Sequence, residues 1–180
     1  ITPTVIQQFH RDLYKFSPIG GGSWKNGDNV VQEILPSGEK RVRFMPVSAF
    51  QTPHAIEELC SYINDPVYQN EVDSLILICA FIFDFLCIHP FNDGNGRIAR
   101  LLTLLLLYKS GYEVGRFISI EKIIEESKES YYESLEKSSQ SWHDGQHNLF
   151  PWIEYMLGVI IAAYKEFESR VGVIEDSRGN

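Results

Sequence analysis

The sequence predicts an all-α protein that carries one small β-hairpin. Apolar residues recur at helical spacing through most of the 180 residues. Two long apolar segments, residues 75–88 and 101–107, flank a short polar and glycine-rich segment, which indicates two buried helices joined by a loop. Alternating strand-like residues occur on both sides of Pro36-Ser37-Gly38, a turn signal. We therefore expect a helical core with a hairpin at about residues 30–46.

The N-terminal part of the chain is expected to form a helix, a flexible connection and the hairpin. Residues 4–15 are amphipathic, and their apolar stripe consists of Val5, Ile6, Phe9 and Leu13. The glycine-rich residues 20–23 break this helix. Residues 30–34 and 41–44 then fit two strands, in which Val42 and Phe44 alternate with arginines.

The remainder of the chain is expected to be helical. Thr52-Pro53 is a favourable pair for a helix start. Gly111 is placed to end the helix that starts at Arg97, and Ser119, with Glu121 close behind, is placed to cap the next one. The expected helices cover residues 52–63, 72–88, 97–110, 119 onward, 126–139 and 150–171, with a loop at 142–147.

The domain organisation follows from these elements. We expect an N-terminal helix and glycine-rich connection over residues 1–26, a core that includes the hairpin over residues 27–175, and a frayed polar tail over residues 176–180. The chain begins at Ile1 rather than at a methionine, which suggests a piece of a longer protein.

Composition narrows the function class. An apolar content of 44% indicates one globular domain, and a net charge of −8 argues against a general nucleic-acid-binding surface. The apolar run before His89 contains Asp84 and is too short for a membrane span, so we expect a cytoplasmic protein without membrane contact. Cys60, Cys79 and Cys87 lie in apolar helical contexts and are expected to be reduced core residues.

The most informative segment is His89–Arg100, with the sequence HPFNDGNGRIAR. Pro90 should end the preceding helix, because the residue before a proline is pushed out of the α region. Gly94, Asn95 and Gly96 tolerate a sharp turn that aims successive backbone N–H groups at one point. The following helix starts here, and a helix N-terminus attracts anions.

The charged residues of this segment favour a polyphosphate ligand. Arg97 and Arg100 share one face of a helix start, where cations are unfavourable unless an anion lies between them. Asp93 would repel such an anion unless a divalent cation such as Mg²⁺ bridged the two. His89 titrates near neutrality and is the natural general base. The alternatives are a helix-end histidine, a turn aspartate and solvated arginines.

The same segment resembles the signature H-P-F-x-[DE]-G-N-G-R-x-x-R of the Fic (filamentation-induced-by-cAMP) family at every specified position. Residues 27–46 also look like the flap hairpin of that family, and residues 52–170 look like its helical core. The resemblance implies a protein adenylyltransferase, which moves AMP from ATP to a hydroxyl side chain of a target protein and releases pyrophosphate.

The resemblance also implies residue roles. His89 would deprotonate the target hydroxyl, and Asp93 would hold Mg²⁺. The implied nucleotide-binding set is Phe91, Asn92, Gly94, Asn95, Gly96, Arg97, Arg100, Tyr132 and Gln140, in which Phe91 packs the loop against the core. Tyr131, Tyr132, Ser139 and Gln140 lie on the helix that closes over adenine in the family, although an ordinary packed helix fits these residues equally well. The target protein would pair with the flap hairpin, for which an ordinary surface hairpin is the alternative.

Three questions stay open at this stage. The same site could transfer another nucleotide or a phosphate-containing group, although Gly96 stands where the kinase-like members of the family have a lysine. A non-catalytic nucleotide-binding module is the alternative from another class. His143 and His147 are four residues apart, but Gly145 lies between them and no third ligand is near, so a surface loop is favoured over a metal pair.

Regulation gives a final expectation. Many Fic proteins are silenced by a helix of pattern [ST]-x-x-x-E-[GN], whose glutamate pairs with the second arginine of the signature, here Arg100. No glutamate of this chain fits the pattern. We therefore expect no glutamate of the chain to compete for Arg100, and an inhibitory helix would have to come from a missing segment or a partner.

Overall fold

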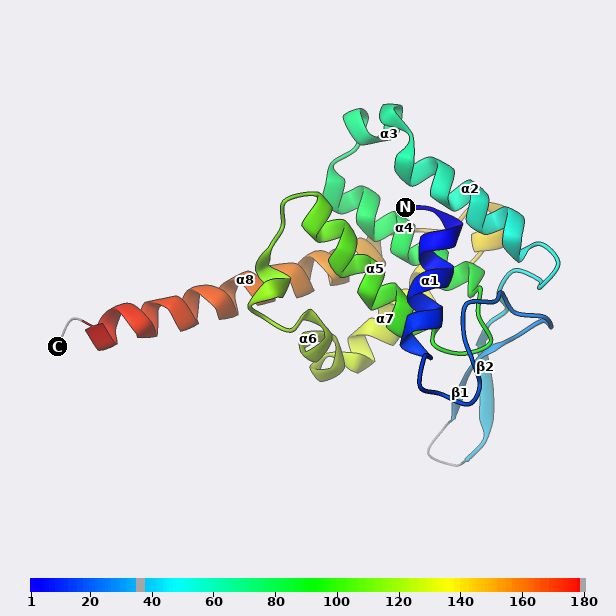
Figure 1. Ribbon diagram of the computed structural model, residues 1–180, viewed down its shortest axis with the longest axis horizontal. Helices are drawn as coiled ribbons and strands as arrows, with labels where there is room; N and C mark the ends of the chain where they lie inside the picture. The colour runs from blue at the N-terminus through cyan, green and yellow to red at the C-terminus, as the bar shows by residue number, and fades with distance from the viewer. Residues whose placement is uncertain (35–37, 179–180) are drawn as a thin grey trace.

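The computed structural model describes residues 1–34 and 38–178 and has the predicted all-α architecture with one small hairpin. Helix α4 (Ser74–Ile88) runs through the middle, and α5 (Asn95–Lys109) packs beside it (Figure 1). The other helices are α1 (Pro3–Leu13), α2 (Thr52–Asn64), α3 (Pro66–Glu71), α6 (Ile120–Glu126), α7 (Lys128–Ser139) and α8 (Phe150–Arg178), with 3-10 turns at Val114–Arg116 and Trp142–Asp144.

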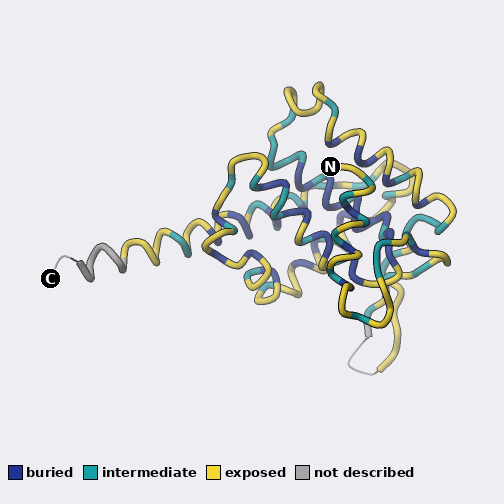
Figure 2. Tube along the Cα trace, in the orientation of Figure 1, coloured by how far each residue is buried: buried dark blue, intermediate teal, exposed yellow. Residues whose placement is uncertain are grey.

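Helix α4 forms the centre of the core because it is apolar on nearly every side. Asp73 caps its start by accepting a hydrogen bond from the backbone N–H of Leu75. Phe83 and Phe85 are completely buried, and each such side chain contributes roughly 1.5–3 kcal/mol of hydrophobic stabilisation. Trp152 of α8 donates from its indole to the Cys79 carbonyl at 2.8 Å, which ties α8 to the middle of α4. Figure 2 shows the buried positions gathered around this axis.

The hairpin consists of β1 (Val31–Ile34) and β2 (Lys40–Phe44), paired antiparallel with Gln32 opposite Val42. An irregularity between Val31 and Gln32 shifts the register. Pro36 and Ser37 of the predicted turn lie outside the described residues. The hairpin protrudes from one end of the helical body (Figure 1).

Several elements differ from the sequence expectations, and α5 begins at Asn95 rather than at Arg97. The expected helix over residues 72–88 starts at Ser74, because Asp73 serves as its N-cap, and the short α3 precedes it. Residues 142–144 form a 3-10 turn within the predicted loop. Helix α8 continues to Arg178, beyond the expected end at 171, and extends away from the helical body (Figure 1), with residues 168–172 exposed (Figure 2).

The cysteines are free and buried, as expected. Burial raises the pKa of the Cys60 thiol to about 11 and that of the Cys79 thiol to about 12, so both are protonated at neutral pH. Among the helices that the structure describes, none combines the length and apolar character that crossing a membrane requires.

Candidate active site

His89 lies directly after α4 in a strained backbone conformation. It is the C-cap residue, with φ 51° and ψ 60°, a left-handed backbone geometry that residues other than glycine rarely adopt. Pro90 follows His89, and α4 ends before this proline, as predicted from the sequence. Burial lowers the pKa of the His89 imidazole to about 4, so the ring is neutral at pH 7.

A hydrogen bond sets the tautomer of the His89 ring. Its Nδ1 lies 3.2 Å from the carbonyl oxygen of Leu86, and a carbonyl only accepts, so Nδ1 carries the proton. Nε2 then keeps its lone pair, and no hydrogen bond within residues 1–34 and 38–178 occupies it. The ring is therefore ready to accept a proton at Nε2.

The loop that follows is held by its own side chains. Asn95 accepts a hydrogen bond from the Phe91 N–H at 2.9 Å and donates one to the Phe91 carbonyl at 2.8 Å. The Phe91 ring is completely buried and stacks on the ring of His10, with centroids 3.8 Å apart. These two side chains shape the loop from inside, which leaves its backbone to face a ligand.

The start of α5 offers donors to an anion. Gly94 is its N-cap, with φ 82° and no side-chain capping bond, so the first-turn N–H groups have no acceptor within the helix. A Cβ atom at Gly94 would also lie 2.9 Å from the Tyr14 ring, so only glycine fits here. These N–H groups are the kind of donor that the predicted phosphate site requires, and phosphate binding at this turn stays a prediction.

Asp93 and Arg97 are held together by Tyr14, a residue that sequence reasoning missed. The Tyr14 hydroxyl donates to Asp93 Oδ2 at 2.6 Å and accepts a hydrogen bond from Arg97. Arg97 also pairs with Asp93 at 3.2 Å. The Tyr14 hydroxyl, with the Gly94 N–H and Arg97, holds the pKa of the Asp93 carboxyl below its usual range.

Asp93 fits the role of a single protein ligand to Mg²⁺. Its side chain is 69% exposed, so its carboxylate is accessible from solvent. No cluster of three His, Cys, Asp or Glu side chains suitable for a metal occurs in the described ranges. Magnesium typically uses one or two carboxylates together with substrate phosphates and water, and an isolated exposed carboxylate beside the predicted phosphate-binding turn suits that mode.

The second arginine of the segment is not free, which corrects the sequence expectation. Arg100 donates from Nε to Glu121 Oε1 at 2.9 Å. The expectation was wrong because it searched for one local pattern, whereas the fold returns α6 to the side of α5 and brings Glu121 to Arg100. The Glu121 side chain is 64% exposed, so the pair is a surface ion pair of about 0–1 kcal/mol.

A cavity of about 220 Å³ lies between the hairpin, the loop and α7. Its lining residues are Val31, Gln32, Arg43, Phe44, Leu86, Cys87, His89, Gly96, Arg100, Tyr131, Tyr132, Leu135, Glu136 and Ser139. The cavity therefore brings together four of the predicted site residues: His89, Gly96, Arg100 and Tyr132.

The other predicted residues lie outside this lining. Phe91 and Asn95 are buried beneath the loop, and Asp93 and Arg97 lie on its exposed side. Asn92 is exposed and lies 3.5 Å from Asn26. Gln140 is exposed at the end of α7, one position beyond Ser139, which does line the cavity.

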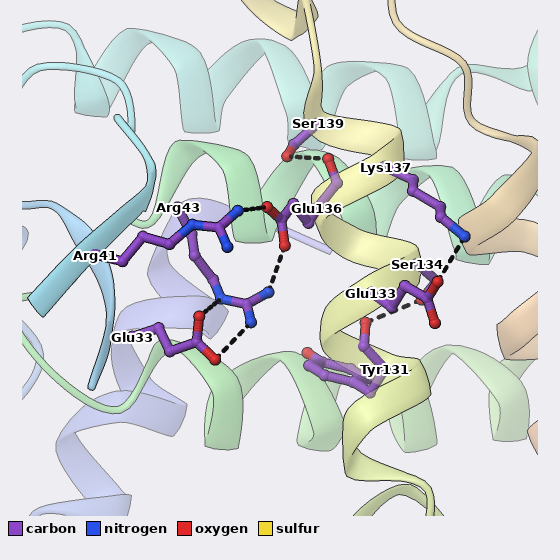
Figure 3. A network of polar contacts seen from close by, with 9 residues as sticks. All are labelled: Glu33, Arg41, Arg43, Tyr131, Glu133, Ser134, Glu136, Lys137 and Ser139. Atoms are coloured by element: carbon purple, nitrogen blue, oxygen red, sulfur yellow. Dashed lines mark hydrogen bonds and ion pairs between the residues drawn. The ribbon is translucent and has the colours of Figure 1, made fainter. Parts of the chain in front are cut away.

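Ion pairs between side chains hold the hairpin against α7 (Figure 3). Glu136 of α7 accepts hydrogen bonds from both hairpin arginines, Arg41 and Arg43, each at 2.6 Å. Arg43 also pairs with Glu33 across the hairpin at 2.8 Å and lies over the Tyr132 ring. One carboxylate therefore holds the hairpin against the helix that lines the cavity.

The loop at residues 142–147 also contacts the hairpin and α4. His143 lies with its Nε2 2.7 Å from the Met45 carbonyl, and its ring stacks on Phe44. Trp142 donates from its indole to Asp84 at 2.8 Å. Residues 143–146 are exposed, which fits the surface loop favoured from the sequence, and these contacts tie that loop to the hairpin and to α4.

The chain is similar in sequence to known proteins. The sequence profile of the Fic/DOC family matches residues 1–107. Protein adenylyltransferase fic-1 from Caenorhabditis elegans is 33% identical over 70 residues, which is 39% of this chain and 14% of that protein. Its namesake from Caenorhabditis briggsae is 25% identical over 138 residues, which is 77% of this chain and 24% of that protein. The chain thus spans less than a quarter of either curated relative.

A solved structure shows that the similarity to this family extends to the fold. A Fic family protein from Desulfovibrio desulfuricans G20 superposes with a TM-score of 0.72 at 27% identity, over 94% of this chain and 47% of that one. The profile match covers more than half of the chain and includes the whole loop from His89 to Arg100. The chain therefore belongs to the Fic/DOC family.

Proposed function

We propose that the protein transfers AMP from ATP to a hydroxyl side chain of a target protein. The observation that carries the proposal is a neutral imidazole close to a helix start whose first N–H groups have no acceptor within the helix. His89 has an unoccupied Nε2 and lines the same cavity as Gly96 and Arg100. The two curated relatives named above are protein adenylyltransferases.

The reaction assigns each group one task. The target hydroxyl oxygen attacks the α-phosphorus of ATP, and His89 Nε2 accepts the hydroxyl proton. The bond between the α-phosphorus and the oxygen that leads to the β-phosphate breaks, pyrophosphate leaves, and a phosphodiester links AMP to the target. A positioned base contributes typically 10²–10⁴-fold to such a step.

The positive groups support the charge that develops on the phosphates. The N–H groups at the start of α5 and the Arg100 guanidinium are placed to bind phosphate oxygens. Arg97, beside Asp93, is a second donor on the exposed side of the loop. Asp93 would hold Mg²⁺, which would neutralise charge on the nucleotide phosphates.

We place the nucleoside between the hairpin and α7. Tyr132, Leu135 and Phe44 give this part of the cavity apolar walls. The target would lie along a free edge of the hairpin, where each strand of the two-stranded sheet has one unpaired side. A bound target main chain would then bring its hydroxyl over His89.

A labelling experiment tests the proposal. The protein is incubated with Mg²⁺ and ATP that carries its label on either the α- or the γ-phosphate, in the presence of a cell lysate. Transfer of the α label alone, with the added mass of one AMP, supports the proposal. Transfer of the γ label would mean phosphate transfer, and labelling by another nucleoside triphosphate would identify a different base.

A matched variant separates chemistry from adventitious binding. His89→Asn removes the base and, because asparagine tolerates the left-handed backbone at this position, leaves the phosphate-binding residues in place, so it should bind ATP without transfer. A wild-type protein that binds ATP, labels nothing in the lysate and does not label itself would favour the non-catalytic nucleotide-binding module.

A further inference from the structure

The connection between α1 and β1 makes an unusual set of contacts with the loop that carries His89. Lys25 is only 3% exposed, although it is charged and lies outside any helix or strand. Its backbone N–H donates to the Pro90 carbonyl at 2.8 Å, and its ammonium donates to the Ile88 carbonyl at 3.1 Å. One residue thus binds the carbonyls on both sides of His89.

Asn29 completes the set. Its side-chain N–H groups donate to the His89 carbonyl at 3.2 Å and to the Phe91 carbonyl at 3.1 Å. Its Oδ1 accepts a hydrogen bond from the Lys25 ammonium at 2.7 Å, which fixes the orientation of the amide. Every carbonyl from Ile88 to Phe91 therefore accepts a hydrogen bond from Lys25 or Asn29.

The contacts of Lys25 and Asn29 are made to backbone carbonyls at the end of α4 and at the start of the loop. The last carbonyls of a helix have no partners within the helix, and the carbonyl end carries partial negative charge that a cation stabilises. The left-handed conformation of His89 is unfavourable for a residue other than glycine and persists only where the surroundings impose it. Lys25 and Asn29 supply that constraint from outside the loop.

Burial of the Lys25 charge argues against a purely space-filling role. Its ammonium bonds to two neutral oxygens and forms no ion pair within the described part of the chain. Such burial is costly unless the charge is well hydrogen-bonded. A methionine would fill the same volume at lower cost, but it could not bind the carbonyl at the end of α4.

We propose that Lys25 and Asn29 are positioning residues for His89. The two residues hold the end of α4 and the first residues of the loop, so that the imidazole faces the cavity in one orientation and one tautomer. The catalytic role of Lys25 and Asn29 in this inference rests on the proposed function. Its structural content, a fixed His89 ring, is measurable without any transfer activity.

Two variants test the inference. Asn29→Asp is nearly isosteric, can still pair with Lys25, and replaces the donor that faces two carbonyls by an acceptor. Lys25→Met keeps the side-chain length and removes the ammonium. Asn70→Asp on α3 and Lys165→Met on α8 change the same residue types at exposed positions and serve as matched controls.

Activity gives the first readout. Misplacing a catalytic group by about 1 Å costs on the order of 10²-fold in rate. We expect both variants to lose kcat on that scale while the Kd for ATP changes by less than about threefold, because the phosphate-binding turn lies beyond the contacts that are removed. Unchanged kcat in both variants would overturn the inference, as would parallel losses in kcat and ATP affinity.

Nitrogen NMR of the His89 ring gives the second readout. The wild-type ring should show the tautomer with the proton on Nδ1, and Asn29→Asp should show a mixture of tautomers or exchange broadening. A wild-type tautomer in a folded Asn29→Asp protein would contradict a positioning role. If the wild type transfers nothing, this measurement still decides the inference, so the failure of the proposed function remains distinguishable.

Discussion

Arg100 of α5 and Glu121 of α6 form an ion pair 2.9 Å long at the edge of the cavity. In the proposed function this arginine binds the outer phosphates of ATP, yet it already has a carboxylate partner from its own chain. A bound triphosphate would have to displace that carboxylate or share the guanidinium with it. The first two predictions follow from this competition.

Removing the competing charge should strengthen triphosphate binding. Glu121→Gln keeps the side-chain shape, and we expect ATP to bind up to about fivefold more tightly, the equivalent of a surface pair of about 1 kcal/mol. AMP, which lacks the outer phosphates, should bind as before. Calorimetric titration of both nucleotides measures the difference. Glu125→Gln on the same helix is the control, and equal ATP affinities in the two variants would mean that Glu121 does not compete.

Removing the arginine should have the opposite effect. Arg100→Ala should weaken ATP binding by about tenfold or more, since charge-assisted hydrogen bonds contribute about 1.5–3 kcal/mol, and it should leave AMP binding nearly unchanged. The same calorimetric pair of ligands reports the result. Equal losses for ATP and AMP would place Arg100 away from the terminal phosphates.

The depressed pKa of His89 predicts an unusual pH profile. A base that is neutral above a pKa of about 4 should support a rate that stays flat from pH 8 to about pH 5 and then declines as pH falls toward 4. A histidine with an ordinary pKa would lose activity below about pH 6.5. Initial rates of AMP transfer across this range, with ATP saturating, make the measurement. A midpoint near 6.5 would mean that the imidazole is solvated in the working enzyme.

The same shift has a consequence for stability. Because the folded-state pKa of His89 lies below the unfolded value of about 6.5, the neutral ring stabilises the fold fully above pH 6.5. That contribution should be lost as pH falls from 6.5 through about 4. Urea unfolding of wild type and His89→Asn across this window should show a smaller acid-dependent decline in the variant, and parallel curves would contradict the assignment.

Tyr14 should stabilise the loop through its hydroxyl. Tyr14→Phe removes the hydrogen bonds to Asp93 and Arg97 and keeps the ring. We expect the free energy of unfolding to fall by about 0.5–1.5 kcal/mol, toward the low end because Asp93 is largely exposed, and we expect the pKa of Asp93 to rise. Urea denaturation and a carboxyl NMR titration measure the two effects. Tyr62→Phe, at an exposed ring on α2, should change neither.

Glu136 should control the mobility of the hairpin. Glu136→Gln weakens the hold on both hairpin arginines, so amide hydrogen exchange in β2 should become several-fold to about tenfold faster, the equivalent of about 1 kcal/mol. Glu133→Gln, one turn earlier on α7 and paired with Lys137, is the matched control. Equal exchange rates in β2 of the two variants would show that packing, and not the ion pairs, holds the hairpin.

The sequence predicted those features that depend on neighbours along the chain. Pro90 marked the end of α4, and Ser119 was placed correctly as a cap, since its side chain accepts from the Lys122 N–H at 3.1 Å. The turn at Gly94 followed from residue types that tolerate positive φ. Such features have short-range causes, and the local sequence contains them.

Contacts between distant segments were not predictable in this way. Lys25 reaches Ile88, Tyr14 reaches Asp93, and no periodicity or spacing pairs such positions. Glu121 was overlooked because its relation to Arg100 arises only when α6 folds back against the body. The six-residue α3 was missed because it is too short to show helical spacing.

The left-handed backbone at His89 affects how substitutions there must be read. Most amino acids resist a φ of 51°, whereas asparagine and glycine accept it. An alanine at this position removes the ring and also relaxes the chain toward another geometry, so its phenotype mixes two causes. Asparagine isolates the loss of the imidazole. In a saturation library scored for soluble expression alone, residue 89 should rank substitutions by tolerance of the turn, with asparagine and glycine ahead of valine and isoleucine.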